Sequence, residues 1–369
     1  MRPNRAWPAH SVRFPGIAGP GRSPTASRPR LILHNVPSLG ERAPGTRNQS
    51  CRWWSRELGL LRIRDDAADS VDILSTLRDG ARELADGGQI GRVGMGRSLD
   101  RHLIASAPAG GFSVAPMSRD ENRAFDSVIA DYRAAAGFKR CTAKLVTLDN
   151  AKLSKSLRPS YGLSLAPAAT SGVWNVCPWS TPGCRGVCLA SAGNGRYDTV
   201  TRARSYRTLL LGDHPAAFIA RMADEIRALV RKVGPINYRP NIVSDLRWEL
   251  FCPGLMDIPG VALMDYTKAP THKRASLPNY RLVGSVSERD DDETIRGKVD
   301  HYGSAAVALD LPKGAPLPVA LFGRPVVDGD LSDDRTLGSE LGVVVGLRFK
   351  RPANGATAAD SHGFVRAVG

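Results

Sequence analysis

Three of the six cysteines of this chain fall within one twelve-residue segment, Cys177-Pro-Trp-Ser-Thr-Pro-Gly-Cys184-Arg-Gly-Val-Cys188. The segment is rich in Gly and Pro and offers little apolar core in which three separate thiols could be buried. A ligand shared by Cys177, Cys184 and Cys188 is the simplest explanation, so we expect a metal ion or an iron–sulfur cluster there. Ordinary structural cysteines or a local disulfide are the alternatives.

The other cysteines, Cys51, Cys141 and Cys252, stand singly. The chain shows no charged n-region followed by an apolar h-region and a cleavage site, so we expect a reducing, cytoplasmic setting. No apolar run approaches the roughly 18 residues of a membrane span. We therefore expect a soluble protein without a membrane partner.

The net charge of +15 is of the kind that nucleic-acid-binding proteins carry, but it is unevenly distributed. Residues 1–60 contain ten Arg, no Lys and two Glu, which is about half of the excess. Such a Pro-, Gly- and Arg-rich segment buries too little apolar surface to offset its ordering entropy. We expect residues 1–116 to be a dispensable, disordered extension that arises from too early a translation start, with Met95 or Met117 as the alternative start. A transit peptide and a nucleic-acid-binding arm are the other interpretations.

From about residue 120 the apolar residues recur at spacings that predict regular structure. Helical spacing covers Ala124–Ala136, Thr199–Leu211 and Pro215–Val233. After Gly234 the pattern changes to short apolar runs that predict strands: Ile236–Val243, Val261–Tyr266, Tyr280–Val286, Ala305–Leu309, Pro318–Leu321 and Val343–Leu347.

Strands about 15 to 25 residues apart, with helical or loop segments between them, favour parallel βα units over an antiparallel sandwich. We therefore predict an α/β fold for residues 117–350, a partial or complete TIM-like parallel barrel with a Cys-rich loop. An antiparallel edge within residues 305–347 is the alternative for the later strands. Residues 351–369 are expected to be a flexible tail.

Polar side chains follow three successive predicted strands, at the edge where parallel α/β folds collect their chemistry. They are Ser244 and Asp245, then Lys268, then Ser287 and Glu288. Helix capping by Ser or Asp, a solvated Lys and a first-turn Glu are the structural alternatives. Three such strand ends in succession favour a functional site.

An acidic turn, Val327-Asp328-Gly329-Asp330, follows a later apolar run. Asp-Gly is first of all a turn signal, so a solvated turn is one interpretation. The other is that Asp328 and Asp330 form a carboxylate pair that binds a cation or transfers protons. The turn lacks the full spacing of a calcium-binding EF-hand loop.

The chain resembles the bacteriophage gene product 88 family over about residues 141–350. The segments that carry the resemblance are the cysteine cluster, Ser244-Asp245-Leu246-x-Trp248-Glu249, Asp265-Tyr266-Thr267-Lys268, Ser285-x-Ser287-Glu288, and Val327-Asp328-Gly329-Asp330 with Val345-Gly346-Leu347. The order of these segments is also similar to a second phage family, whose three-cysteine motif looks related to radical SAM barrels. This resemblance implies a phage-type protein in the host cytoplasm.

Three closely spaced cysteines suit a four-iron, four-sulfur cluster with one iron open to S-adenosylmethionine. The spacing of six and then three intervening residues departs from the radical SAM pattern of three and then two, and Val187 stands where an aromatic residue is usual. Zinc is the alternative cofactor. A tetrahedral zinc site needs a fourth ligand, for which Cys252, Cys141 or His214 could serve.

From the resemblance and the strand ends together we expect a radical SAM-like iron–sulfur enzyme that modifies a nucleic acid or nucleotide. The candidate catalytic residues are Asp245, Lys268, Glu288, Asp328 and Asp330, and the candidate cofactor-binding residues are Ser244, Trp248, Tyr266 and Ser287. A zinc-stabilised nucleic-acid-binding protein without catalysis, using the Arg-rich helix with Arg202, Arg204 and Arg207, is one alternative. A transglycosylase-like nucleobase-exchange enzyme is the other.

Overall fold

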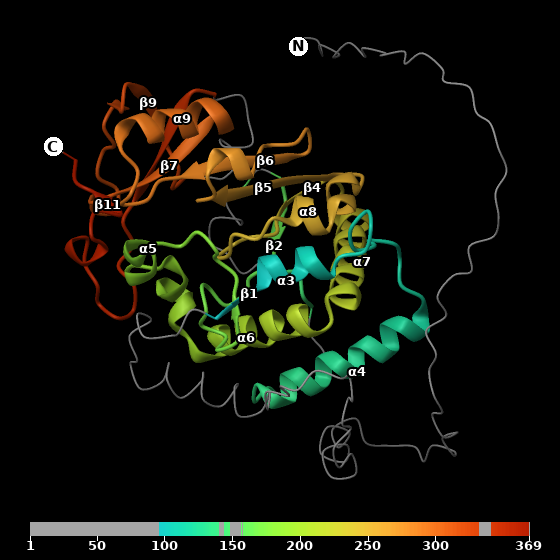
Figure 1. Ribbon diagram of the computed structural model, residues 1–369. Helices are drawn as coiled ribbons and strands as arrows, with labels where there is room; N and C mark the ends of the chain where they lie inside the picture. Colours follow the sequence, from blue (N-terminus) through green and yellow to red (C-terminus); the bar gives the residue numbers. More distant parts are fainter. Residues whose placement is uncertain (1–95, 140–143, 148–155, 157, 332–340, 369) are drawn as a thin grey trace, which may run out of the picture. The chain divides into compact units, whose positions relative to one another are not determined.

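Parallel strands dominate the computed structural model of the chain (Figure 1). The structure describes residues 96–368 apart from residues 140–143, 148–155, 157 and 332–340. Its main sheet has nine strands, which pair in the order β2-β4-β5-β6-β7-β10-β9-β8, with β11 added to β7. The strands are β2 (Ser160–Gly162), β4 (Ile236–Arg239), β5 (Val261–Thr267), β6 (Tyr280–Ser285), β7 (Ser304–Leu309), β8 (Ala320–Leu321), β9 (Arg324–Asp328), β10 (Val343–Arg348) and β11 (Val365–Arg366).

All pairs in this sheet are parallel except the short β8–β9 hairpin. The prediction of an α/β fold with a parallel sheet is therefore confirmed, and the antiparallel alternative holds for that hairpin alone among the described pairs. The pairings of the described strands form a path from β2 to β8, and they do not show a closed barrel.

The three predicted helices are confirmed as α4 (Arg119–Ala135), α6 (Asp198–Asp213) and α7 (Pro215–Val233). α4 begins earlier than the apolar spacing predicts because Ser118 and Glu121 form a capping box at its first turn. α7 has Pro215 at its first position and ends at Gly234, whose φ of 80° few other residues adopt. A fourth helix, α9 (Asp292–Tyr302), connects β6 to β7.

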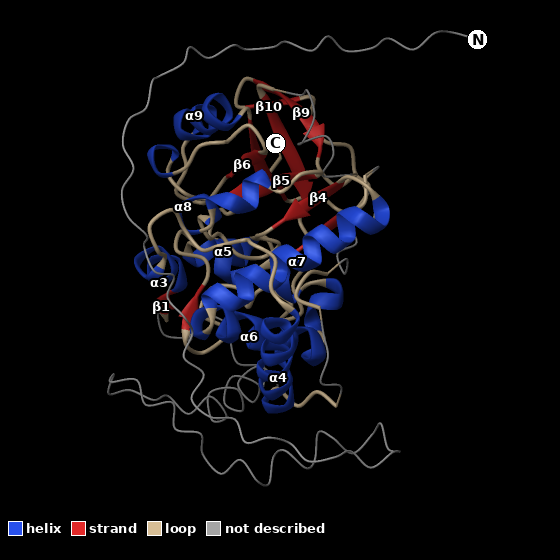
Figure 2. Cartoon of the chain, turned by 90° about the vertical axis from the view of Figure 1, so that its right-hand side faces the viewer, coloured by secondary structure: helices blue, strands red, loops and turns tan. Residues whose placement is uncertain are grey.

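The core lies between the helices and the sheet. α6 and α7 pack on each other, and α7 packs on β4, whereas α9 packs on β6 and β7. Figure 2 shows α4, α6 and α7 gathered on one side of the strands and α9 on the other. Among the described residues no helix is both long and apolar enough to cross a membrane.

The described part of the predicted N-terminal extension packs into the domain. Residues 97–98 form strand β1, which pairs with β3 (Trp174–Asn175), and they lead into helix α3 (Leu99–Ser106). Leu99 and Leu103 of α3 are fully buried in the main core cluster. Residues 96–116 are therefore folded rather than disordered as we expected, because the apolar pair that anchors α3 is too short to produce a sustained period. The expectation that they are dispensable for folding stays a prediction. The expected disorder of residues 1–95 lies outside the described residues.

The C-terminal segment is also docked, whereas the sequence led us to expect a flexible tail over residues 351–369. A short 3-10 helix, η7 (Ala359–Ser361), contacts helix α5 (Pro182–Gly186). Strand β11 then pairs with the last two residues of β7. Figure 1 shows this segment beside α5. A two-residue strand carries no detectable alternation, so only the tertiary structure reveals the docking.

Candidate functional site

The cysteine segment folds into a short helix between two turns. Thr181 is the N-cap of α5, and its hydroxyl accepts a hydrogen bond from the Cys184 backbone N–H at 3.3 Å. Pro182 occupies the first helical position, where its missing N–H costs nothing. Cys177 therefore precedes the helix, Cys184 lies within it, and Cys188 follows it.

The three cysteines line one small cavity, with a volume of about 30 Å³. Each is half-buried and has a free thiol. Cys177 is fixed most closely: its sulfur accepts a hydrogen bond from the Ala168 backbone N–H at 3.3 Å and lies 3.6 Å from the Val243 carbonyl oxygen, to which its thiol donates. The other lining residues are Pro167, Ala168, Ser180 and Arg185. The cavity therefore brings the whole cysteine motif together.

The thiols are not arranged as a preformed metal site. Among the described residues no group of three or more His, Cys, Asp or Glu side chains has metal-binding geometry. Burial raises the pKa of Cys177 and raises that of Cys188 to about 11, so both thiols hold their protons at neutral pH. Because a thiophilic metal binds thiolates, it would have to displace those protons and draw the sulfurs together. The donor set suits zinc or an iron–sulfur cluster.

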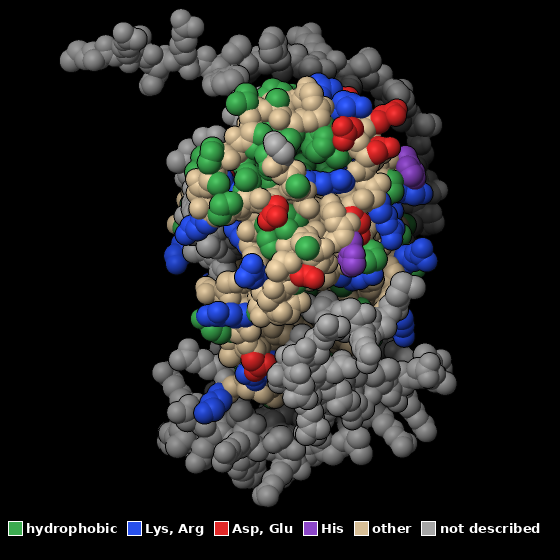
Figure 3. Space-filling view, turned by 90° about the vertical axis from the view of Figure 1, so that its left-hand side faces the viewer, with side chains coloured by type: hydrophobic (Ala, Val, Ile, Leu, Met, Phe, Trp, Pro, Cys, Tyr) green, Lys and Arg blue, Asp and Glu red, His purple; other side chains and the backbone are tan. Residues whose placement is uncertain are grey.

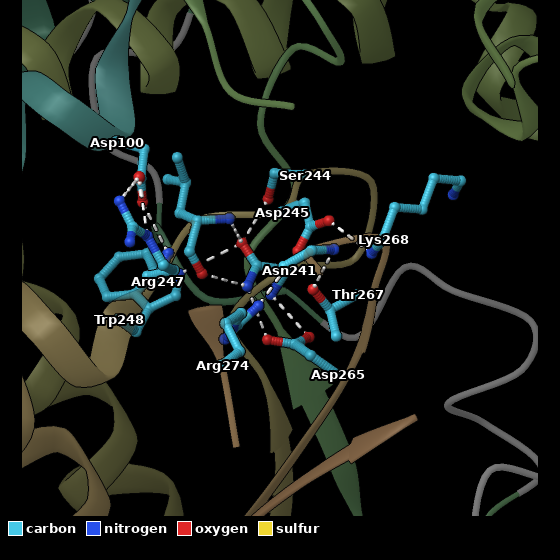
Figure 4. A network of polar contacts seen from close by, with 12 residues as sticks. Asp100, Asn241, Ser244, Asp245, Arg247, Trp248, Asp265, Thr267, Lys268 and Arg274 are labelled. Atoms are coloured by element: carbon cyan, nitrogen blue, oxygen red, sulfur yellow. Dashed lines mark hydrogen bonds and ion pairs between the residues drawn. The ribbon is translucent and has the colours of Figure 1, made fainter. Parts of the chain in front are cut away.

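Lys268 follows β5 and lies next to the cysteines. Burial is the largest single influence and acts to lower its pKa, but Cys184, Asp245, Cys177 and Cys188 act together in the opposite direction, and the pKa is raised. Its side chain extends away from the polar network behind it (Figure 4). The ammonium lies 5.3 Å from the ring centroid of Phe364, and within the described residues it has no hydrogen bond or ion pair. It is therefore available to bind an anion.

Asp245 follows β4 and connects three parts of the site. Its backbone N–H donates to the Val176 carbonyl oxygen at 2.9 Å, next to Cys177. One carboxylate oxygen accepts from the Lys268 backbone N–H at 2.8 Å, and the other from Arg274 at 3.0 Å. The Arg274 side chain is fully buried and also binds Glu249. Asp245 is thus engaged by its own chain.

A buried polar network underlies these contacts, and the sequence analysis missed its centre (Figure 4). The Asn241 amide donates to Asp265 at 2.7 Å and its oxygen accepts from Ser244 at 2.8 Å and from Trp248 at 3.3 Å. Tyr280 donates to Asp265 at 2.6 Å. Asp265 is fully buried, which raises its pKa to about 6. The signal available in the sequence was the position of Asn241, just after β4.

The candidate cofactor-binding residues are engaged within the protein. The polar atoms of Ser244 and Trp248 bind Asn241. Ser287 is buried and its hydroxyl lies 3.2 Å from Asp290. Tyr266 is half-buried, with Arg239 over its ring at 5.1 Å. Their hydrogen bonds and stacking support the strand ends rather than reach the cavity.

Glu288 follows β6 and binds the cysteine-bearing helix directly. Its carboxylate accepts hydrogen bonds from the Thr181 hydroxyl at 2.6 Å and from the Gly183 backbone N–H at 2.8 Å. Burial is the largest single influence and acts to raise its pKa, but the hydrogen bonds from Thr181 and Gly183, with smaller contributions from its own backbone N–H and from Arg289, together outweigh it, and the pKa is lowered. The structure therefore places Glu288 beside the cysteines with its carboxylate turned to the helix that carries them.

Asp328 and Asp330 lie elsewhere, at the end of β9. Arg348 of β10 binds Asp328 at 2.9 Å and Asp330 at 3.2 Å, and Lys350 binds Asp330 at 3.1 Å. Neither aspartate lines the cysteine cavity. β10 and β7 separate β9 from β6, so these carboxylates are not brought together with Glu288.

Among the described residues, the structure does not bring the alternative zinc ligands to the cysteine cavity, and it engages the arginines of the Arg-rich helix within the protein. Cys252 and His214 do not line the cavity, and Cys141 lies outside the described residues. The guanidinium groups of the Arg-rich helix bind within the protein. Arg202 donates to the Ala136 carbonyl oxygen and pairs with the Asp198 carboxylate, and Arg204 donates to the Ser164 hydroxyl and the Ala190 carbonyl oxygen. Arg207 donates to the Lys144 carbonyl oxygen. Figure 3 shows one face on which Lys and Arg side chains are spread among hydrophobic and acidic ones.

Comparison with known protein families identifies the family of this chain. The family model described as gene product 88 matches residues 136–367, which is well over half of the sequence. The match includes the cysteine segment, all the strand ends described above and the docked C-terminal segment. Neither the curated proteins nor the solved structures gave a match. The chain belongs to the gene product 88 family.

Proposed function

We propose that this protein is an iron–sulfur enzyme of the radical SAM-like kind, with Cys177, Cys184 and Cys188 as the cluster ligands. The observation that carries the proposal is the shared cavity: three thiols from one loop open into one space. Three protein ligands leave one iron of a four-iron cluster free for a further ligand.

The surrounding fold supports this proposal. The cysteine segment comes after β2 in the chain, with β3 of the small sheet between them, and Asp245, Lys268 and Glu288 follow β4, β5 and β6, which are the next three strands in the main sheet. These ends of parallel strands lie at one edge, where α/β enzymes bind their substrates. The sequential strand order is also that of a partial parallel barrel.

Among the described residues of the site we distinguish the cluster ligands, the residues that support them, and one lysine whose ammonium has no hydrogen-bond partner. Glu288 holds the cysteine-bearing helix, and Asp245 holds the backbone next to Cys177 and Lys268. Lys268 has an ammonium without a hydrogen-bond partner among the described residues, next to the cysteines. We assign to it the carboxylate of S-adenosylmethionine or a phosphate of a nucleotide substrate. When bound, the cluster would supply one-electron chemistry, and the protein would supply binding and orientation.

A zinc site is the second candidate, and the size of the cavity favours it. The cavity is small, with a volume of about 30 Å³, so a single ion enters it with less rearrangement than a four-iron cluster. A zinc ion with three cysteine ligands would accept its fourth ligand from solvent or substrate. This reading needs no redox chemistry.

Metal analysis of anaerobically purified protein tests the proposal. We expect about four iron and four inorganic sulfides per chain and a brown colour. Replacing any one of Cys177, Cys184 and Cys188 with Ala should remove most of the iron, whereas Cys252→Ala, a buried cysteine outside the cavity, should retain it. Colourless protein with one zinc per chain would establish the second candidate. Protein that binds neither metal after reconstitution would contradict both.

A further inference from the structure

Helix α5, which carries Cys184, lies very close to two other segments. Gly183 is buried at the point of closest approach. A Cβ atom at this position would overlap the Ser361 carbonyl oxygen and would lie 2.8 Å from the Glu288 carboxyl carbon. No side chain other than hydrogen fits there without displacement of backbone. The three segments therefore meet at Gly183.

Both neighbours of Gly183 are themselves fixed. Glu288 is tied to α5 by the hydrogen bonds from Thr181 and Gly183. Ser361 is buried, and its hydroxyl accepts from the Val365 backbone N–H at 3.0 Å, at the start of β11. Arg366 of β11 donates to the carbonyl oxygens of Ser287 and Asp290, at 2.9 and 2.7 Å. The C-terminal segment is thus anchored to the same strand end that holds Glu288.

The same segment also contacts Lys268, since Phe364 lies under its ammonium. Residues 359–366 therefore contact the cysteine-bearing helix on one side and the Lys268 ammonium on the other. Neither contact is needed to connect strands in the sheet.

We infer that Gly183 is a positioning residue, which lets Glu288 and the C-terminal segment hold α5 so that Cys184 faces the cavity. The expected effect on metal binding rests on the proposed function. The placement of Cys184 itself is independent of any metal.

Gly186 provides a matched control within the same helix. A Cβ atom there would lie 3.4 Å from its nearest neighbour, the Asp360 carbonyl oxygen, which is an ordinary contact. Gly183→Ala and Gly186→Ala therefore make the same chemical change and alter helix propensity alike. They differ in whether α5 must move away from Glu288 and Ser361.

The test measures each cysteine separately in the full-length protein. Iodoacetamide labelling without metal, followed by mass spectrometry, gives the alkylation rate of each thiol. In Gly183→Ala we expect the alkylation rate of Cys184 to rise by about tenfold, which corresponds to a fall of ~1.4 kcal/mol in the free energy that limits access to this thiol. Cys177 should change little, because Ala168 and Val243 hold it. Equal rates at Cys184 in the two glycine variants would overturn the inference.

Two further measurements separate the possible failures. Glu288→Gln keeps the shape of the carboxylate and weakens its hydrogen bonds, so we expect a smaller rise in the alkylation rate of Cys184. This variant replaces Gly183→Ala in the test if Gly183→Ala does not fold. Titration with Co²⁺ reports thiolate ligation by its charge-transfer absorption, which we expect to fall in Gly183→Ala and to persist in Gly186→Ala. If the wild-type protein binds no Co²⁺, the proposed function fails, whereas the alkylation rates still decide the role of Gly183.

Discussion

The carboxylate of Asp245 accepts a hydrogen bond from the backbone N–H of Lys268 at 2.8 Å, which joins the ends of two neighbouring parallel strands. The same aspartate donates its own backbone N–H to Val176, next to Cys177. Asp245 therefore links the backbone of Lys268 to the backbone next to Cys177. This link is absent from any local pattern because residues 176, 245 and 268 are far apart in the chain.

Lys268 should be required for ligand binding and not for metal binding. In Lys268→Met the apolar stem keeps its packing and the ammonium is lost, so we expect iron or zinc content like that of the wild type. Affinity for S-adenosylmethionine, measured by calorimetry on the metal-loaded protein, should fall by about tenfold to a hundredfold, as for a charge-assisted hydrogen bond of roughly 1.5–3 kcal/mol. Lys273→Met, at an exposed lysine, is the control. Unchanged affinity in Lys268→Met would remove Lys268 from the site.

Asp245→Asn should destabilise the fold. Arg274 is fully buried and would keep Glu249 but lose one of its two carboxylate partners. We expect the free energy of unfolding to fall by about 2–3 kcal/mol, measured with a chemical denaturant. Asp257→Asn, at an exposed carboxylate, should have little effect. A loss in Asp245→Asn no larger than that of the control would show that the Arg274 pair is not important for stability.

Helix α3 should contribute substantially to stability. Leu103→Ala removes a fully buried side chain, and we expect a loss of about 2–5 kcal/mol in the free energy of unfolding. Ile104→Ala, at the adjacent half-buried position, should cost clearly less. Similar small losses in both variants would restore the expectation that this segment is dispensable.

Asp265 should make stability depend on pH below neutrality. Its pKa is raised by burial to about 6 from an ordinary value of 3.8, so between these values the folded protein binds a proton that the unfolded chain releases. The free energy of unfolding should therefore fall as the pH rises from about 4 to about 6, by roughly 1–3 kcal/mol from this group.

Asp265→Asn provides the comparison, because Asn does not titrate. The variant will be less stable overall, since its amide must replace an acceptor of hydrogen bonds from Asn241 and Tyr280. The difference between the two pH profiles isolates Asp265 from the other carboxylates. Parallel profiles from pH 4 to 6 would show that its pKa is not raised.

The acidic turn should be structural. Asp328→Asn weakens the partly buried contact with Arg348, for which we expect a loss of about 1 kcal/mol in unfolding free energy. Metal content and ligand affinity should stay at wild-type values because the turn does not line the cavity. Loss of either property in this variant, with stability retained, would return Asp328 to the list of functional residues.

The sequence alone was sufficient for features whose signal is local. Helix α7 could be predicted to its end residues, because its apolar positions recur at helical spacing between Pro215 and Gly234. The parallel arrangement followed from the spacing of the apolar runs, and the polar strand ends marked the edge of the sheet. The cysteine cluster could be identified because its members are close in the chain.

Only the tertiary structure decided how those features are used. The sequence marked Glu288 as a candidate catalytic residue, but its carboxylate accepts hydrogen bonds from Thr181 and Gly183 at the start of α5, more than a hundred residues away. Phe364, in what looked like a tail, meets Lys268 because β11 adds to β7. The physical reason is the same in each case: burial and hydrogen bonding depend on which segments the sheet brings together, and a short segment carries no periodicity that reveals its partner.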